Sequence, residues 1–357
     1  ANSLDVQYYV IANDDTGRLF LRHLRDAARR GVRVRLLVDD LHTAGADVLL
    51  SGLAAEENVE VRLFNPFPAG RRHISTRILL SLFDMRRVNR RMHNKLFIAD
   101  GSMAVIGGRN IANDYFRRLG NTNFIDIDAL AVGQIVPQLE RSFDDYWNSK
   151  FSYSIGSIVL PALSRQLSRD AFERLTRTAL NLQTTVAERD LLGNRPLAID
   201  LQDGVVPLTW ADAHAFADEP DKSLRPVGSA QHPAQVPAQS VRMHLQTLVR
   251  SAKNEVIQTS PYLIPGDDGM TSVRLLRARG VSITMITNSL AGTDEGLVHA
   301  GYQRYRPALL EAGVRLYEIS PSRMASARRD GRFVSAGGRL HGKAVIVDRR
   351  EVFIGSL

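Results

Sequence analysis

Two histidines and two lysines stand in the same short pattern at two places in the chain. The stretch from His93 to Asp100 and the stretch from His341 to Asp348 both read H-x-K-x4-D. Each position of the second stretch follows its counterpart by 248 residues. One such octapeptide is weak evidence for a catalytic site, but two in the same register indicate a duplicated half-site.

Two imidazoles and two ammonium groups suit phosphodiester chemistry. One imidazole can attack phosphorus and form a phosphohistidine, while the other protonates the leaving oxygen and then deprotonates the incoming alcohol or water. Residues two apart project from the same face of a strand, so we expect His93 to project with Lys95, and His341 with Lys343. The lysines would neutralise the non-bridging phosphate oxygens, so we expect no metal and no cofactor.

Small residues follow both patterns at the same distance. The first copy leads to Gly107, Gly108 and Asn110, and the second to Gly355 and Ser356. We expect the glycines to let the backbone pass close to a phosphate, and Asn110 to add an amide donor to phosphate binding.

The nearby acidic residues differ in their expected roles. Asp100 and Asp348 each precede a tight turn, where an aspartate bonds to nearby backbone, so we interpret them as structural. A neutral nucleophilic histidine needs its second nitrogen held, and Asp126 or Asp128 could hold it. The alternative is that Asp126 and Asp128 are two exposed acids of a strand.

The composition favours anionic partners. The net charge is +8, with 41 arginines against five lysines, and two of those five are the motif lysines. Such a charge fits nucleic acid, phospholipid headgroups or other phosphates. The absence of cysteine excludes disulfides, thiolate catalysis and cysteine-based zinc sites. No stretch approaches the roughly 18 apolar residues of a membrane span.

The repeat extends to the elements around the motifs. Strands alternate with amphipathic helices that end at glycine, a pattern typical of an α/β fold with a helix-covered sheet. The first half has predicted strands at 4–11, 32–39, 59–64, 95–99 and 103–106 and a helix at 16–30. The second has predicted strands at 255–259, 281–287, 314–319, 344–347 and 352–354 and helices at 270–279 and 301–312. We predict one half at 1–160, a helical and loop linker at 161–240, and the other half at 241–357.

Three further segments carry separate predictions. Apolar spacing predicts helix over 163–192, and the composition of 218–239 predicts a loop. We interpret 321–338 as a surface loop that acts as a lid. The basic and apolar stretch 71–91 is a candidate membrane contact, with a buried helix with basic ends as the alternative.

The paired motifs resemble those of the phospholipase D superfamily, in which two H-x-K-x4-D motifs build one active site. The segments 4–9, 16–19, 31–40, 260–262, 287–290 and 298–302 are most similar to bacterial cardiolipin synthases of the type C group. The resemblance implies two pseudo-symmetric phospholipase D-like halves, each a mixed β-sheet flanked by helices, with the site in the cleft between them. It also implies His93 as the nucleophile, His341 as the acid and base, and Asp126 as the residue that orients the nucleophile.

The resemblance further implies transfer of a phosphatidyl group to phosphatidylglycerol, with phosphatidylglycerol or phosphatidylethanolamine as the donor. We expect peripheral association with the bacterial inner (cytoplasmic) membrane; the side and the oligomeric state stay open. A phospholipase that uses water and a nuclease of the same superfamily are the alternatives, although such nucleases are often smaller, single-motif dimers. Both motifs keep their catalytic residues, which argues against an inactive binding module.

The family pattern continues the second motif as G-S-x-N, whereas the chain stops at Leu357, one residue before the expected asparagine. We therefore expect the chain to be part of a longer protein whose remainder contributes to the site.

Overall fold

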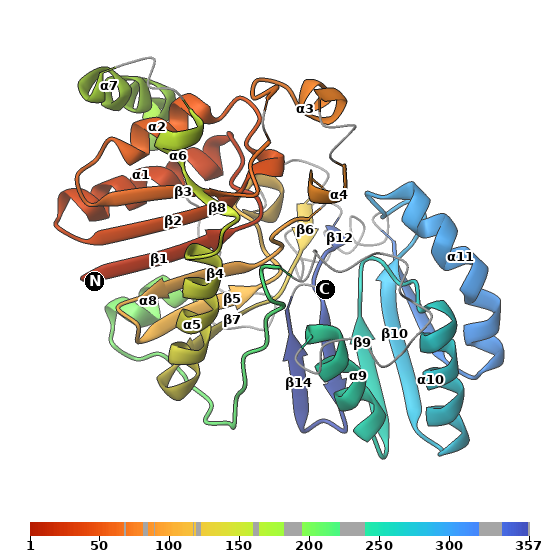
Figure 1. Cartoon of the computed structure of the whole chain (residues 1–357). Helices are drawn as coiled ribbons and strands as arrows, with labels where there is room; N and C mark the ends of the chain where they lie inside the picture. The colour runs from red at the N-terminus through yellow and green to blue at the C-terminus, as the bar shows by residue number, and fades with distance from the viewer. Residues whose placement is uncertain are drawn as a thin grey trace.

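The computed structural model contains two β-sheets, each flanked by helices, with their strand ends directed toward a common centre (Figure 1). It describes residues 1–67, 69–80, 85–88, 90–116, 118, 123–159, 164–181, 195–221, 240–320 and 338–355.

The first sheet is mixed and has the strand order β7-β5-β4-β1-β2-β3-β8. Strands β1, β2 and β3 run parallel, whereas β4 is antiparallel to β1, and β5 to β4. The strands are β1 (Ser3–Tyr8), β2 (Arg33–Asp39), β3 (Val59–Phe64), β4 (Lys95–Ala99), β5 (Met103–Gly107), β7 (Asp128–Val132) and β8 (Ser152–Ser154).

The second sheet repeats this arrangement over five strands, in the order β11-β10-β9-β13-β14. Strands β9, β10 and β11 run parallel, β13 is antiparallel to β9, and β14 to β13. The topology therefore confirms the predicted duplication and the mixed sheets. The strands are β9 (Glu255–Thr259), β10 (Ser282–Asn288), β11 (Arg315–Ile319), β13 (Ala344–Val347) and β14 (Glu351–Ile354).

Helices cover both faces of the first sheet. Leu36 and Leu37 are neighbours in β2, so they point to opposite faces; both are fully buried, and each belongs to a different core. The Leu36 core includes α1 (Asp15–Arg29) and α2 (Asp47–Ala54), and the Leu37 core includes α5 (Val136–Trp147). In the second half, α9 (Val241–Ser251), α10 (Gly266–Ala278) and α11 (Gly296–Glu311) pack into a single core with the sheet.

Local sequence explains where the first helix begins and ends. The side chain of Asp14 accepts a hydrogen bond from Gly17 N (2.9 Å) and so caps α1. After the helix, Gly31 has a φ of +90°, which favours glycine, and Gly280 does the same after α10 with a φ of +83°.

A two-stranded parallel sheet joins the halves. It pairs β6 (Asn123–Ile125), from the first half, with β12 (Gly338–Leu340), from the second. The pairing aligns Ile125 with Leu340, and it lies between the two large sheets (Figure 1).

Most predicted elements are present with small shifts at their ends. Helix α10 begins earlier than predicted. The prediction started at the first apolar residue, and the first turn of the helix, 266–269, carries none. Of the predicted helix 163–192, the described part forms α7 (Arg165–Thr176) and a 3-10 turn, Arg177–Asn181, and α7 packs against α1 and α2. The rest of that helix, residues 222–239 and the predicted lid at 321–337 lie outside the described residues. The remaining short helices are α3 (Ile74–Leu80), α4 (Met85–Val88), α6 (Ile155–Ile158) and α8 (Leu197–Gln202).

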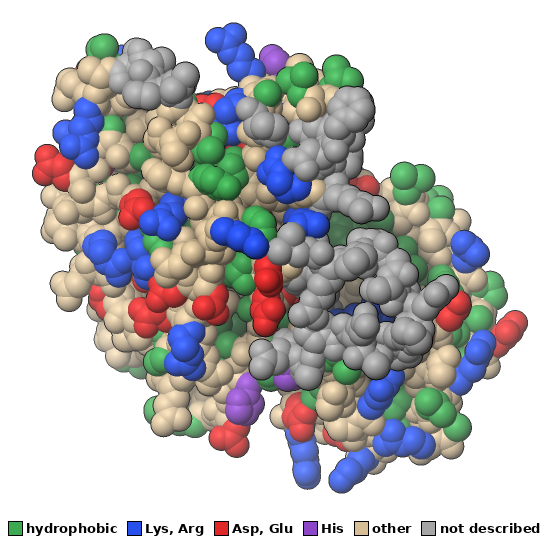
Figure 2. All heavy atoms as spheres, viewed as in Figure 1, with side chains coloured by type: hydrophobic (Ala, Val, Ile, Leu, Met, Phe, Trp, Pro, Cys, Tyr) green, Lys and Arg blue, Asp and Glu red, His purple; other side chains and the backbone are tan. Residues whose placement is uncertain are grey.

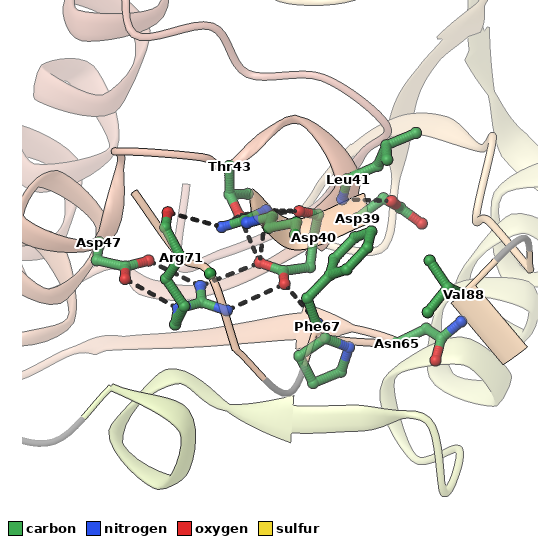
Figure 3. Close-up of polar contacts among 12 residues, drawn as sticks. Asp39, Asp40, Leu41, Thr43, Asp47, Asn65, Phe67, Arg71 and Val88 are labelled. Atoms are coloured by element: carbon green, nitrogen blue, oxygen red, sulfur yellow. Dashed lines mark hydrogen bonds and ion pairs between the residues drawn. The ribbon is translucent and has the colours of Figure 1, made fainter. Parts of the chain in front are cut away.

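Two arginines of the basic and apolar segment around α3 point into the protein. Arg77 is fully buried and donates to the backbone oxygen of Asp40 and to Thr43 Oγ1 (3.2 Å). Arg71 forms ion pairs with Asp40 (3.0 Å) and Asp47 (2.7 Å), as Figure 3 shows. These arginine charges are therefore compensated inside the protein.

The apolar side chains of α3 point outward instead. Ile74, Leu79 and Leu80 are 43%, 65% and 58% exposed, and Arg72 and His73 beside them are exposed as well. Figure 2 shows hydrophobic, basic and histidine side chains gathered over α3. Within the described residues, no helix combines the length and apolar character needed to cross a bilayer.

Asp100 and Asp348 tie each motif strand to the first strand of its own half. Asp100 Oδ1 accepts hydrogen bonds from the backbone N of Asn2 and Ser3, at the start of β1. Asp348 accepts three such bonds, of 2.7–2.9 Å, from residues 253–255 at the start of β9. Both are structural, as predicted, although they bind the neighbouring strand rather than their own turn. These backbone donors lower the pKa of both carboxyl groups.

We predict that Asp100→Ala and Asp348→Ala each lower the urea midpoint of unfolding. A carboxyl whose pKa is lowered in the folded state stabilises the fold above its unfolded value, about 3.9, and this contribution disappears as the pH falls. The deficit of both variants relative to the parent should therefore be largest near pH ~7 and shrink below pH ~4. Asp212→Ala, at an exposed position, is the control; a deficit that does not depend on pH would contradict the prediction.

Candidate active site

Asp126 and His341 form a buried pair at the junction of the two halves. Asp126 directly follows β6 and His341 directly follows β12, so the parallel register that aligns Ile125 with Leu340 brings them side by side. Asp126 Oδ2 lies 2.6 Å from His341 Nδ1, and both side chains are buried. The prediction that Asp126 orients His93 is therefore wrong: the register assigns this carboxylate to the other histidine.

Aromatic rings enclose the His341 imidazole. The ring centroids of Tyr115 and Phe124 both lie 5.1 Å away, and that of Tyr262 lies 6.5 Å away. Tyr115 belongs to a 3-10 turn, Asn113–Phe116 (η3), and its hydroxyl oxygen lies 3.3 Å from Nε2. Both ring nitrogens of His341 therefore face a polar group of the first half.

The two motif lysines make the same contact in both halves. Lys95 Nζ donates to the carbonyl oxygen of His93 (2.8 Å), and Lys343 Nζ donates to that of His341 (3.0 Å). Each histidine precedes its motif strand, because β4 begins at Lys95 and β13 just after Lys343. Each motif histidine thus lies close to its lysine, as predicted. The two are joined by the hydrogen bond from the lysine to the histidine carbonyl, because regular strand alternation does not extend back to the histidine.

The positive charges of both halves act on one another. Burial, followed by the charges of Lys95 and Lys343, lowers the pKa of His93 to about 2. Burial and the charge of Lys343 lower the pKa of Lys95 to about 7, and burial lowers that of Lys343. A cleft between the halves is lined by His93, Lys95 and Lys343. His93 is therefore neutral at physiological pH, as a nucleophile must be, and the motif residues of both halves belong to one site.

A tyrosine lies beneath each motif lysine. Lys95 Nζ is 5.2 Å from the ring centroid of Tyr9, and Lys343 Nζ is 5.7 Å from that of Tyr262. A cation over an aromatic face is attracted by the ring, so both tyrosines help to hold the ammonium groups. Sequence reasoning assigned neither tyrosine a role. Each follows the first strand of its half, so the duplication itself was the signal that could have identified them.

Asp39, at the end of β2, supports the residue before the first motif. It is fully buried and accepts hydrogen bonds from Met92 N (2.8 Å) and Arg91 (3.1 Å). Burial raises the pKa of Asp39 to about 6, although the charge of Arg91 opposes this. Asp39 lies beside the Asp40 ion-pair network (Figure 3), so one acidic dipeptide fixes both the segment before His93 and the base of α3.

The glycine turn packs against two carboxylates. A Cβ at Gly107 would overlap the Asp128 carboxylate, and one at Gly108 would overlap that of Asp126. The glycines thus make room for these two carboxylates, and their predicted closeness to phosphate stays a prediction. Asp128 instead pairs with Arg109 (2.6 Å).

Three predicted turn residues remain, namely Gly355, Ser356 and Asn110. Gly355 N donates to Lys343 O (3.3 Å), and Ser356 lies outside the described residues. Asn110, which we predicted to bind phosphate, is buried; its Oδ1 accepts from Val10 N (3.3 Å) and its Nδ2 donates to the Tyr115 hydroxyl (2.9 Å). Only its second amide hydrogen remains for the predicted contact.

Among the residues that the structure describes, no group of three or more His, Cys, Asp or Glu side chains is placed to hold a metal ion.

Comparison with known proteins identifies the family. The family described as "Cardiolipin synthase, PLD-like domain" matches residues 1–147 and 245–357. The chain is 37% identical over 362 residues to cardiolipin synthase C of Escherichia coli (strain K12), which covers 99% of the chain and 72% of that protein. It is 24% identical to a cardiolipin synthase of Geobacillus kaustophilus (strain HTA426), across 99% of the chain and 54% of that protein.

A solved structure agrees on the fold. The phosphatidylserine synthase of Haemophilus influenzae superimposes with a TM-score of 0.57 at 11% identity, over 97% of this chain and 71% of that one. At this identity the match supports the two-sheet architecture alone. The family match and the E. coli relative confirm the resemblance drawn from the paired motifs: the chain belongs to the cardiolipin synthase family, with its phospholipase D-like domain.

Proposed function

We propose that the chain is a phosphatidyltransferase that forms a phosphohistidine and passes its phosphatidyl group to the glycerol hydroxyl of phosphatidylglycerol, which yields cardiolipin. The observation that carries this proposal is the pairing of a neutral His93 with a His341 whose Nδ1 is held by Asp126. An unprotonated nucleophile and an oriented acid and base are the two parts that a two-step displacement needs.

In the first step, His93 attacks phosphorus, and the bond from phosphorus to the leaving alcohol oxygen breaks as His341 gives that oxygen a proton. In the second, His341 removes the proton from the hydroxyl of phosphatidylglycerol, whose oxygen attacks phosphorus and breaks the phosphorus–nitrogen bond. His93 is then free again, and His341 has regained a proton in place of the one that it gave in the first step. Water in place of the lipid hydroxyl would give phosphatidic acid.

The product mixture tests the proposal. The chain is incubated with phosphatidylglycerol, with and without phosphatidylethanolamine, and the lipids are separated. Cardiolipin supports the transferase, and a higher yield with phosphatidylethanolamine identifies that lipid as the donor. Phosphatidic acid alone would indicate hydrolysis and contradict the transfer step, and no lipid product would contradict the proposal as a whole.

We predict opposite consequences for the two histidines. His93→Ala should abolish turnover and leave no covalent adduct, because no phosphohistidine can form. His341→Asn should slow the reaction about 10²–10⁴-fold, because the acid of the first step and the base of the second are both gone; the acid-labile, alkali-stable adduct that still forms should persist, because no base activates the incoming hydroxyl. The adduct is measured with phosphatidylglycerol labelled in its phosphate; an adduct in His93→Ala would contradict the assignment of the nucleophile.

Lys95 couples phosphate binding to a proton. With the pKa of Lys95 at about 7, the ammonium charge is present below that value and is lost as the pH rises through it. A bound phosphodiester anion favours the charged form, so binding above pH ~7 requires uptake of a proton.

We therefore predict that short-chain phosphatidylglycerol binds with proton uptake at pH ~8 and with little uptake at pH ~6. Calorimetry on the His93→Ala variant, in two buffers of different ionisation enthalpy, measures the uptake without turnover. Adding Lys95→Met should remove the uptake, and its persistence would assign the proton to another group.

We also propose that α3 is the surface that contacts the phospholipid bilayer. Its outward residues are Ile74, Leu79 and Leu80, and the exposed Arg72 and His73 beside them suit anionic headgroups. The charges of Arg71 and Arg77 do not oppose this contact, because both side chains bond to Asp40. Peripheral attachment through this face agrees with the net charge of +8.

We predict that the double change Leu79→Ser and Leu80→Ser weakens binding to phosphatidylglycerol vesicles at least about tenfold. Each leucine that enters the apolar layer contributes roughly 1.5–3 kcal/mol. Turnover of a short-chain, non-micellar substrate should be unchanged. Leu275→Ser is the matched control, because Leu275 is 61% exposed on α10, away from α3 (Figure 1). Equal vesicle binding by the double variant and the parent would overturn the proposed face.

A further inference from the structure

The hydroxyl of Tyr115 connects two predicted site residues from different halves. Its oxygen lies 2.9 Å from Asn110 Nδ2 and 3.3 Å from His341 Nε2. Tyr115 is buried, and its ring meets the imidazole edge-on, with an interplanar angle of 89°. The turn after the first motif thus reaches the nitrogen that would exchange protons with the substrate.

The chemistry of the donors and acceptors favours one direction for the hydrogen bonds along this chain. Val10 N can only donate, so the oxygen of the Asn110 amide faces it and the amide nitrogen faces Tyr115. That nitrogen donates to the tyrosine oxygen. Among the described residues, the hydroxyl hydrogen then has one acceptor within reach, which is His341 Nε2.

The other side of the ring completes the pattern. Asp126 Oδ2 accepts the hydrogen of His341 Nδ1 (2.6 Å), and Asp126 Oδ1 accepts from Ile127 N (2.9 Å). A ring that donates through Nδ1 and accepts at Nε2 is the neutral imidazole, in one tautomer.

We propose that Tyr115 is a positioning residue that holds His341 as the neutral, Nδ1-protonated base before substrate binds. When Nε2 carries a proton it must donate, and the Tyr115 hydroxyl is left without its acceptor until a phosphate or alcohol oxygen of the substrate accepts from it. Substrate would therefore help His341 to take up the proton that the first step uses. This inference rests on the proposed acid–base role of His341.

Other groups also face His341, and the test must keep them constant. The neighbouring charged and titratable groups are Asp126, Asp114, His93, Lys343 and Tyr262. Replacing Tyr115 by phenylalanine removes one hydroxyl, keeps the ring, and leaves all of these in place.

The experiment follows the His341 ring by nitrogen-15 NMR in the substrate-free chain, over a pH titration, with His341→Asn to assign its signals. We expect the Nδ1-protonated tautomer in the parent. In Tyr115→Phe we expect a mixture of tautomers and a titration midpoint higher by about 0.5–1 pH unit, which corresponds to one lost hydrogen bond to the neutral ring. The alkaline limb of the pH–rate profile should shift to higher pH in the same variant, because the first step needs the protonated ring.

The matched control is Tyr302→Phe. Tyr302 is also buried, and its hydroxyl donates to Glu318 (2.9 Å) in the core of the second half. We expect no change in the His341 tautomer or midpoint in this variant. A change as large as that in Tyr115→Phe would indicate a general packing effect and overturn the proposal.

A second variant covers the case in which Tyr115→Phe does not fold. Asn110→Asp replaces the amide donor by a carboxylate that accepts the tyrosine hydrogen, so the His341 midpoint should again rise. An unchanged or lowered midpoint in a folded variant, or an Nε2-protonated ring in the parent, would overturn the inference. Because these readouts need no substrate, they separate this inference from the proposed function, which the covalent adduct and the lipid products test.

Discussion

The pairing of β6 with β12 is the constraint on which the site depends. Within the described part of the chain, these short parallel strands form the one sheet that takes a strand from each half, and their register decides which carboxylate meets which histidine. Because parallel strands run in the same direction, the residues that follow them, Asp126 and His341, emerge side by side. The halves can therefore be related by duplication and still build a site with unequal parts.

The two half-sites share their lysine geometry and differ in their histidine environment. Each lysine bonds to the carbonyl of its own histidine and lies over a tyrosine ring. His341 has a carboxylate of the other half at 2.6 Å, and burial and nearby positive charge lower the pKa of His93. Two histidines from one repeated motif thus have different surroundings, as nucleophilic and acid–base roles require.

The sequence predicted the large features because they repeat and because they are local. Strands such as Lys95–Ala99 and Ala344–Val347 were located from apolar runs next to the motifs, and the 248-residue offset predicted the two equivalent sheets. The motif aspartates were recognised as structural from their turns alone. These inferences needed only short-range patterns, and the family comparison agrees with the predicted fold.

Contacts between distant segments were not predictable in the same way. The partner of Asp126 depends on a register set by residues more than 200 positions away, and no local pattern encodes it. Tyr115 becomes notable only once Asn110 and His341 lie on either side of it. The sequence left two orientations of the segment around α3 open, since leucines and arginines close together do not reveal which set is buried. Asp40 and Asp47, from another part of the chain, bond to Arg71 and Arg77.

The inward position of Arg71 and Arg77, in and just before α3, affects how ionic strength would act on attachment to a bilayer. With Arg71 and Arg77 compensated by buried carboxylate and carbonyl oxygens, a contact between α3 and a bilayer would depend more on its leucines than on Coulomb attraction. Salt screens charge–charge attraction over about 10 Å at 0.1 M, whereas it does not weaken the transfer of apolar groups out of water. Attachment through α3 would thus persist at salt concentrations that release proteins held by polybasic segments.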